Sequence, residues 1–121
     1  MVTFKLKSKE NGIYIYEYYP NGDFSKKAGV IRLDTVAQET KIEKVAEDDY
    51  LQVITAKELN ESREWISKTR QEEGLSPLTE KAWPLEKQDL VFYYYGAYVE
   101  SRIIKDLKNN SLQEEGFIAW G

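Results

Sequence analysis

Hydrophobic and polar residues alternate along the first third of the chain, a pattern typical of β-strands with one buried face. In residues 2–7 the apolar residues Val2, Phe4 and Leu6 share one face, and polar residues share the other. The pair Asn11-Gly12 follows, which favours a tight hairpin turn because both residues tolerate positive φ. Further strands are predicted at residues 13–19, 28–33 and 41–46. This part of the chain therefore predicts an antiparallel β-meander.

The strand predicted at residues 13–19 has two faces of different character. We expect the face that carries the isoleucines to turn toward the helices, and its members are Ile13, Ile15, Glu17 and Tyr19. The opposite, open face of the sheet would then present three tyrosines spaced by two residues, namely Tyr14, Tyr16 and Tyr18. Such a row serves either cross-strand packing or recognition of a partner.

A first helix is predicted from Ala56 to Glu73. Thr55–Glu58 has the form of a capping box, and Gly74 suits a left-handed carboxyl-terminal cap. The apolar stripe of this helix is thin, so we expect most of its circumference to be in water. Ser111–Glu114 resembles another capping box, and the apolar residues 116–120 predict a tail that docks on the body of the protein.

The segment DLVFYYYGAY, residues 89–98, contains four tyrosines and one phenylalanine. Apolar residues recur at helical spacing from Leu85 to Leu107, which favours one helix from residue 85 or 89 to 108. The alternative is a strand at 90–95 followed by a helix at 97–108. On the helix, Phe92 and Tyr95 would face the core, and the missing side chain of Gly96 would let a neighbour approach closely.

The outer side of that second helix carries the most specific surface feature of the sequence. Tyr94 and Tyr98 lie four residues apart there, next to Arg102 and Lys105. Tyrosine and arginine are enriched at interface hot spots, so these four residues are the candidate partner-binding strip. The alternative is that both rings pack on neighbouring loops or tryptophans.

These elements predict an α+β fold in a single domain spanning residues 1–121. Its N-terminal antiparallel β-meander, of three to five strands, would pack against two C-terminal α-helices.

The sequence has no cysteine and no histidine. This removes nucleophile pairs that need histidine, histidine base chemistry and the common zinc sites. Glu47-Asp48-Asp49 could offer oxygen ligands to a divalent ion, but no EF-hand-like loop surrounds it, and a solvated turn is the preferred interpretation. The glycines form no phosphate-binding pattern. We therefore expect no catalytic residue, no metal site and no cofactor, and a carboxylate-based enzyme is an unsupported alternative.

The formal net charge is −4 at pH 7, which argues against nucleic-acid binding. Residues 1–46 carry eight lysines and arginines against six acids, whereas residues 47–121 carry nine against fifteen, so the second part suits a basic target. No stretch approaches the length of a membrane span, and we expect a cytoplasmic protein. Lysine outnumbers arginine by 13 to 4, a usage associated with bacteria of A+T-rich genomes and their phages.

From these features we expect a small protein that binds another, unidentified protein, as an adaptor, an inhibitor or an immunity-type protein does. The alternative function is single-stranded nucleic-acid binding, with bases stacked on Tyr14, Tyr16 and Tyr18 near Lys5 and Lys7.

Overall fold

The computed structural model describes residues 1–75, 85 and 87–120, and the chain divides into two compact units. Unit 1 comprises Met1–Leu51 and Phe92–Gly121, and unit 2 comprises Gln52–Val91. An antiparallel sheet in the N-terminal part is followed by two helices, so the predicted α+β arrangement is confirmed. The aromatic stretch after residue 89 opens with a short strand, β6 (Leu90–Tyr93), which pairs with β5 (Leu51–Ile54).

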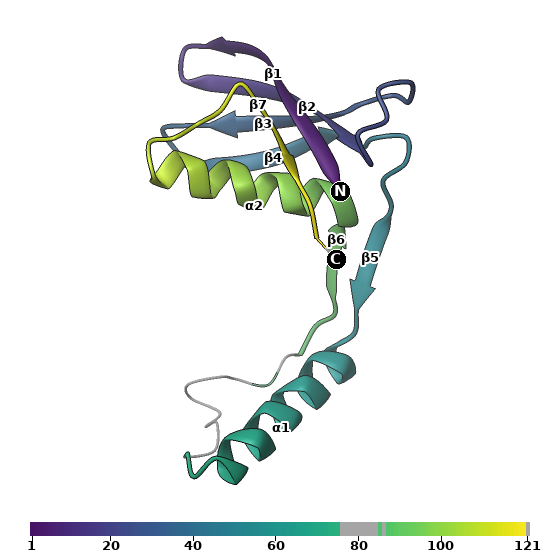
Figure 1. Cartoon of the computed structure of the whole chain (residues 1–121), viewed down its shortest axis with the longest axis vertical. Helices are drawn as coiled ribbons and strands as arrows, with labels where there is room; N and C mark the ends of the chain where they lie inside the picture. The colour runs from purple at the N-terminus through teal and green to yellow at the C-terminus, as the bar shows by residue number, and fades with distance from the viewer. Residues whose placement is uncertain (76–84, 86, 121) are drawn as a thin grey trace. The chain divides into compact units, whose positions relative to one another are not determined.

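Unit 1 contains an antiparallel sheet with the strand order β4-β3-β2-β1-β7 (Figure 1). Its strands are β1 (Val2–Glu10), β2 (Ile13–Pro20), β3 (Gly29–Asp34), β4 (Glu39–Lys44) and β7 (Glu115–Ile118). Asn11 and Gly12 join β1 to β2 with φ values of 52° and 79°, as the sequence predicts for a tight hairpin turn.

A bulge in β1 decides which face of β2 meets the core. Near the hairpin turn, Ser8 pairs with Ile15, but beyond the unpaired Lys7 the register shifts and Leu6 pairs with Tyr16. A shift of one residue exchanges the two faces of a strand relative to its neighbour. Since paired residues share a face, the bulge puts the tyrosine side of β2, and not the isoleucine side, on the face of Leu6.

The predicted orientation of β2 is therefore wrong. Tyr16 and Tyr18 are 1% and 0% exposed, and Tyr14 is partly buried against the same core. The three tyrosines line the inner face of the sheet, where they contact β1 and β3 side chains. They do not form a row on an open face, so bases could not stack on Tyr16 or Tyr18.

Helix α2 (Tyr94–Lys108) lies along this inner face (Figure 1). Its buried residues include Val99 and Ile103. They close a core whose other fully buried hydrophobic members are Val2, Phe4, Tyr16, Tyr18, Ile31, Leu33 and Ala46.

The favoured single helix from residue 85 or 89 to 108 is wrong, and the alternative of a strand followed by a helix is confirmed. Strand β6 ends at Tyr93 and α2 begins directly at Tyr94. The apolar run at helical spacing is also compatible with a strand, because four residues are too few for the two periods to be told apart.

Two glycines make room for the buried ring of Tyr18. A Cβ on Gly29 of β3 would overlap the ring itself. A Cβ on Gly96 of α2 would lie 3.2 Å from the Tyr18 hydroxyl and 2.5 Å from Cδ1 of Ile42. The prediction that Gly96 permits a close approach is confirmed, and the approaching groups are a strand side chain and a phenol.

Unit 2 contains helix α1 (Ala56–Glu72). The predicted capping box is present, because the Thr55 hydroxyl accepts from the Glu58 amide and the Glu58 carboxylate accepts from the Thr55 amide. The helix ends before Gly74, which has a φ of 78°. No residue of α1 is buried, as its thin apolar stripe predicts.

The carboxyl-terminal tail docks on unit 1 as a strand. Ser111–Glu114 does not cap a helix, so that prediction is wrong, and β7 follows instead and pairs with β1. The Ser111 amide and hydroxyl both bond to the carbonyl of Asp106 at the end of α2. The docked tail that the apolar residues predicted is thereby confirmed.

Tyr16 and Tyr18 are buried side by side but differ in hydrogen bonding. The Tyr18 hydroxyl donates to Asp49 Oδ2 at 2.7 Å and accepts from the Ala46 amide at 3.2 Å. The Tyr16 hydroxyl is buried and has no hydrogen-bond partner among the described residues. Burial raises the pKa of Tyr16 from 10.0 to about 12, with smaller contributions from Tyr14 and Asp106.

The two hydroxyls are expected to respond oppositely to removal. Tyr18→Phe should lower the free energy of unfolding by about 1–3 kcal/mol, because Asp49 and the Ala46 amide each lose a partner. Tyr16→Phe should leave it unchanged or raise it, since an unpartnered buried hydroxyl is replaced by hydrogen. Urea unfolding of both variants measures the difference, and a larger loss for Tyr16→Phe would contradict the assignment.

Stability should also fall in alkaline solution. Between pH 10 and about pH 12 the unfolded chain loses the Tyr16 proton while the folded protein keeps it. The free energy of unfolding then decreases by about 1.4 kcal/mol per pH unit for this tyrosine. Tyr16→Phe removes that contribution, so its stability should decline less steeply over the same interval. Equal slopes for wild type and variant in urea unfolding would rule the contribution out.

Candidate functional site

The carboxylate of Asp49 caps helix α2 from a distant part of the chain. Its Oδ1 accepts from the amides of Tyr95 at 2.9 Å and Tyr50 at 2.8 Å. Its Oδ2 accepts from the Gly96 amide at 3.0 Å and from the Tyr18 hydroxyl at 2.7 Å. A carboxylate at this position satisfies free amides of the first turn and interacts favourably with the helix dipole. Asp49 therefore joins the sheet, the loop after β4 and the start of α2.

Asp49 supplies cap hydrogen bonds that the residue directly before α2 does not provide. The N-cap residue of α2 is Tyr93, which makes no side-chain cap hydrogen bond. The preferred interpretation of Glu47-Asp48-Asp49 as a solvated turn is therefore wrong for Asp49, whose two oxygens are both engaged. In the described part of the chain, no group of three or more acidic residues is placed to hold a metal ion.

Five aromatic side chains gather next to this cap, and we call them the aromatic cluster: Tyr50, Tyr94, Tyr95, Tyr98 and Trp120. Tyr98 and Trp120 stack with ring centroids 4.0 Å apart and planes inclined by 8°. Tyr50 stacks on Tyr94 at 5.1 Å and 14°, and Tyr95 meets Tyr94 edge to face. The indole Nε1 of Trp120 donates to the Tyr94 hydroxyl at 2.9 Å. The cluster is thus held both by ring contacts and by a hydrogen bond.

The aromatic cluster is partly open to solvent. Tyr50 is 48% exposed and Tyr98 is 36% exposed, whereas Tyr94, Tyr95 and Trp120 are partly buried. Partial desolvation, followed by the neighbouring phenols, raises the pKa of Tyr50 and Tyr98 above the ordinary value. Both rings are therefore neutral at physiological pH and offer apolar faces with polar edges.

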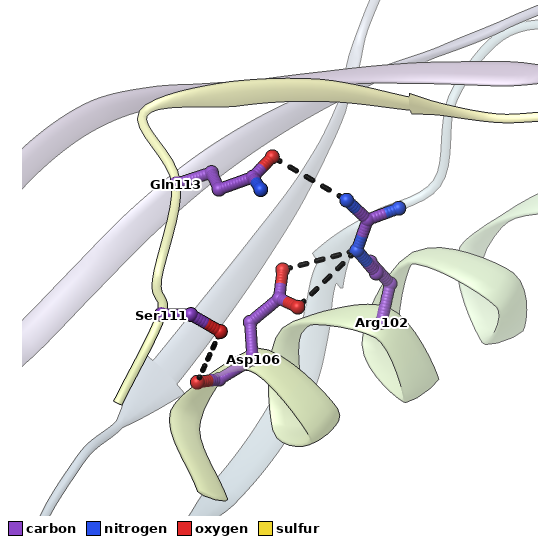
Figure 2. Close-up of polar contacts among 4 residues, drawn as sticks. All are labelled: Arg102, Asp106, Ser111 and Gln113. Atoms are coloured by element: carbon purple, nitrogen blue, oxygen red, sulfur yellow. Dashed lines mark hydrogen bonds and ion pairs between the residues drawn. The ribbon is translucent and has the colours of Figure 1, made fainter. Parts of the chain in front are cut away.

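The structure divides the predicted partner-binding strip. Tyr94 and Tyr98 belong to the aromatic cluster, where they lean on Trp120 as the packing alternative proposed. Arg102 turns away toward the tail, with its Nε 3.1 Å from Asp106 Oδ2 and its guanidinium 3.3 Å from Gln113 Oε1 (Figure 2). The four predicted residues therefore do not form one continuous surface.

Lys105, the fourth residue of the predicted strip, is exposed and does not belong to the aromatic cluster. It lines a shallow groove between β4 and the outer side of α2. Across this groove the Thr40 hydroxyl donates to Glu100 Oε2 at 2.5 Å. The other lining residues are Ala97, Ser101, Ile104, Lys108 and Asn109.

Sequence reasoning missed Tyr50 and Asp49 as parts of the site. One signal was present: a helix that starts at Tyr94 without a serine, threonine, asparagine or aspartate in front of it needs a cap from elsewhere. Periodicity along the chain does not reveal which of many acidic residues supplies that cap. Tyr50 directly follows Asp49 in the chain, so the Asp49 cap also brings Tyr50 to the start of α2. There the Tyr94 amide donates to the Tyr50 carbonyl at 2.9 Å.

No protein-family model, no curated protein and no solved structure matches this chain. Within the residues that the structure describes, no helix is long and apolar enough to cross a membrane.

Removal of the Asp49 carboxylate should lower the stability of the protein. Asp49→Ala is expected to lower the free energy of unfolding by about 2 kcal/mol or more, because it removes a helix cap and leaves the buried Tyr18 hydroxyl without its acceptor. The matched control is Asp48→Ala, since Asp48 is exposed and should change stability by less than about 0.5 kcal/mol. Equal effects in urea unfolding would show that the cap contributes nothing.

Proposed function

We propose that this protein binds another protein through the aromatic cluster. The observation that carries the proposal is the exposure of Tyr50 and Tyr98 in a group of rings that the fold already holds in place. Tyrosine and tryptophan side chains contribute much to interface energies because they bring large area with few rotatable bonds. Ordering of these rings before binding reduces the entropy lost on association.

The chemistry around the cluster favours a partner that presents lysine or arginine side chains. Glu47 and Asp48 are exposed, and they directly precede Asp49 and Tyr50 in the chain. Aromatic faces attract cations, and nearby carboxylates add to the attraction. The acidic balance of residues 47–121 has the same sign. We therefore expect a basic surface or segment of a protein as the occupant.

Nucleic acid is a weaker candidate. The exposed acidic residues that precede Tyr50 in the chain would repel phosphates, and the sheet tyrosines proposed for base stacking include two that are fully buried. An adaptor, an inhibitor or an immunity-type protein in the cytoplasm of a bacterium, or encoded by a phage, would act through a surface of this kind.

Tyr98→Ala tests the proposal, with Trp65→Ala as the control. Trp65 is 68% exposed and lies on α1, so its removal deletes an exposed aromatic side chain outside the cluster. A protein retained from bacterial extract by wild type and by Trp65→Ala should be lost with Tyr98→Ala. With that protein purified, Tyr98→Ala should raise the dissociation constant about tenfold or more, and added salt should weaken binding.

Unaltered binding by Tyr98→Ala would contradict the proposed surface. Binding that is insensitive to salt would contradict the basic character of the partner but leave the aromatic contact standing. Circular dichroism and urea unfolding of each variant establish that a loss of binding does not reflect a loss of folding.

A further inference from the structure

Strand β7 is an edge of the sheet, with β1 on one side (Figure 1). The amide of Leu6 donates to the carbonyl of Glu114, which makes these two residues a hydrogen-bonded pair. Such pairs alternate along antiparallel strands, so Gly116 bonds to β1 next. Glu115 and Phe117 therefore direct their backbone N–H and C=O groups away from β1, toward the free side of the sheet.

The two edges of the sheet differ in their protection. The other edge strand, β4, has the sequence ETKIEK, in which charged residues of both signs discourage pairing with another chain. Strand β7 has the sequence EGFI and one charged residue. On the outer face beside it, Phe117 is 63%, Phe24 54% and Met1 48% exposed, and these three side chains line a hollow together with Thr3, Lys5, Glu115 and Gly116.

We propose that β7 pairs in antiparallel fashion with β7 of a second copy of this chain, with Gly116 on the two-fold axis. In this register Glu115 lies opposite Phe117 of the second copy, and both use their outward backbone groups. Sliding the strands so that Glu115 meets Glu115 would place like charges opposite each other, which is unfavourable. Gly116, which has no side chain, occupies the non-hydrogen-bonded position where two strands approach most closely.

The side chains on the outer face also match across the junction. The two copies of Phe117 become diagonal neighbours, at a separation of about 7–8 Å that aromatic side chains can span. Lys5 is the cross-strand partner of Glu115 within each copy, so the glutamate charge has a counter-charge beside it. The hollows of the two copies then form one apolar strip over a continuous sheet.

The test is the oligomeric state measured by sedimentation over a dilution series. Wild type should dimerise, and Phe117→Glu, which places a second carboxylate opposite Glu115 of the other copy, should raise the dimer dissociation constant about tenfold or more. Val36→Glu adds the same charge at an 87% exposed position in the β3–β4 turn and should leave the dimer unchanged. The double change Phe117→Glu with Glu115→Lys should restore dimerisation, because opposite charges then face each other.

A wild-type protein that stays monomeric at the highest concentration, or a dimer that Phe117→Glu does not weaken, would overturn the proposal. A dimer that is weakened but not restored by the double change would overturn the register. Cross-linking gives a second measurement that does not depend on a destabilising charge. The chain has no cysteine, so a mixture of Glu115→Cys and Phe117→Cys should form the mixed disulfide in preference to either homodisulfide.

Discussion

The carboxylate of Asp49 is the contact on which unit 1 depends. It accepts hydrogen bonds from a buried tyrosine of the sheet and from two amides in the first turn of α2, so one side chain fixes the helix against the strands. Two glycines, Gly29 and Gly96, provide the space that the Tyr18 ring and hydroxyl need. A buried phenol and a helix end would each be costly alone, and each satisfies the other through this carboxylate.

The position of the aromatic cluster follows from that contact. Asp49 and Tyr50 are adjacent in sequence, so the cap brings Tyr50 to the first turn of α2, where it stacks on Tyr94. The tail adds Trp120, which follows β7 in the chain and donates to the Tyr94 hydroxyl. The exposed Tyr50 is thus the chain neighbour of Asp49, which bonds to the buried Tyr18. A candidate surface built in this way is ordered before any partner binds.

Much of the local structure could be predicted from short-range patterns. The hairpin turn at Asn11-Gly12 and the capping box of α1 each depend on a few adjacent residues, and each is confirmed. The close approach at Gly96 is also confirmed, but the groups that approach, Ile42 and Tyr18, come from distant parts of the chain. The start of α2 was misplaced, because β6 is too short for its period to be distinguished from that of the helix. The candidate partner-binding strip is divided for a different reason. Arg102 bonds to Asp106 and to Gln113, which lies eleven residues later in the tail, and so its side chain does not lie beside Tyr94 and Tyr98.

The sequence by itself determined the α+β class, the hairpin turn at Asn11-Gly12 and the capping of α1, since these depend on local backbone preferences and on the spacing of apolar residues. Only the tertiary structure decided which face of β2 is buried. A single unpaired residue, Lys7, shifts the β1–β2 register and so turns Tyr16 and Tyr18 into the core. Alternation along one strand is the same for either face, and the choice is made by the pairing of two strands and by a helix that closes over them.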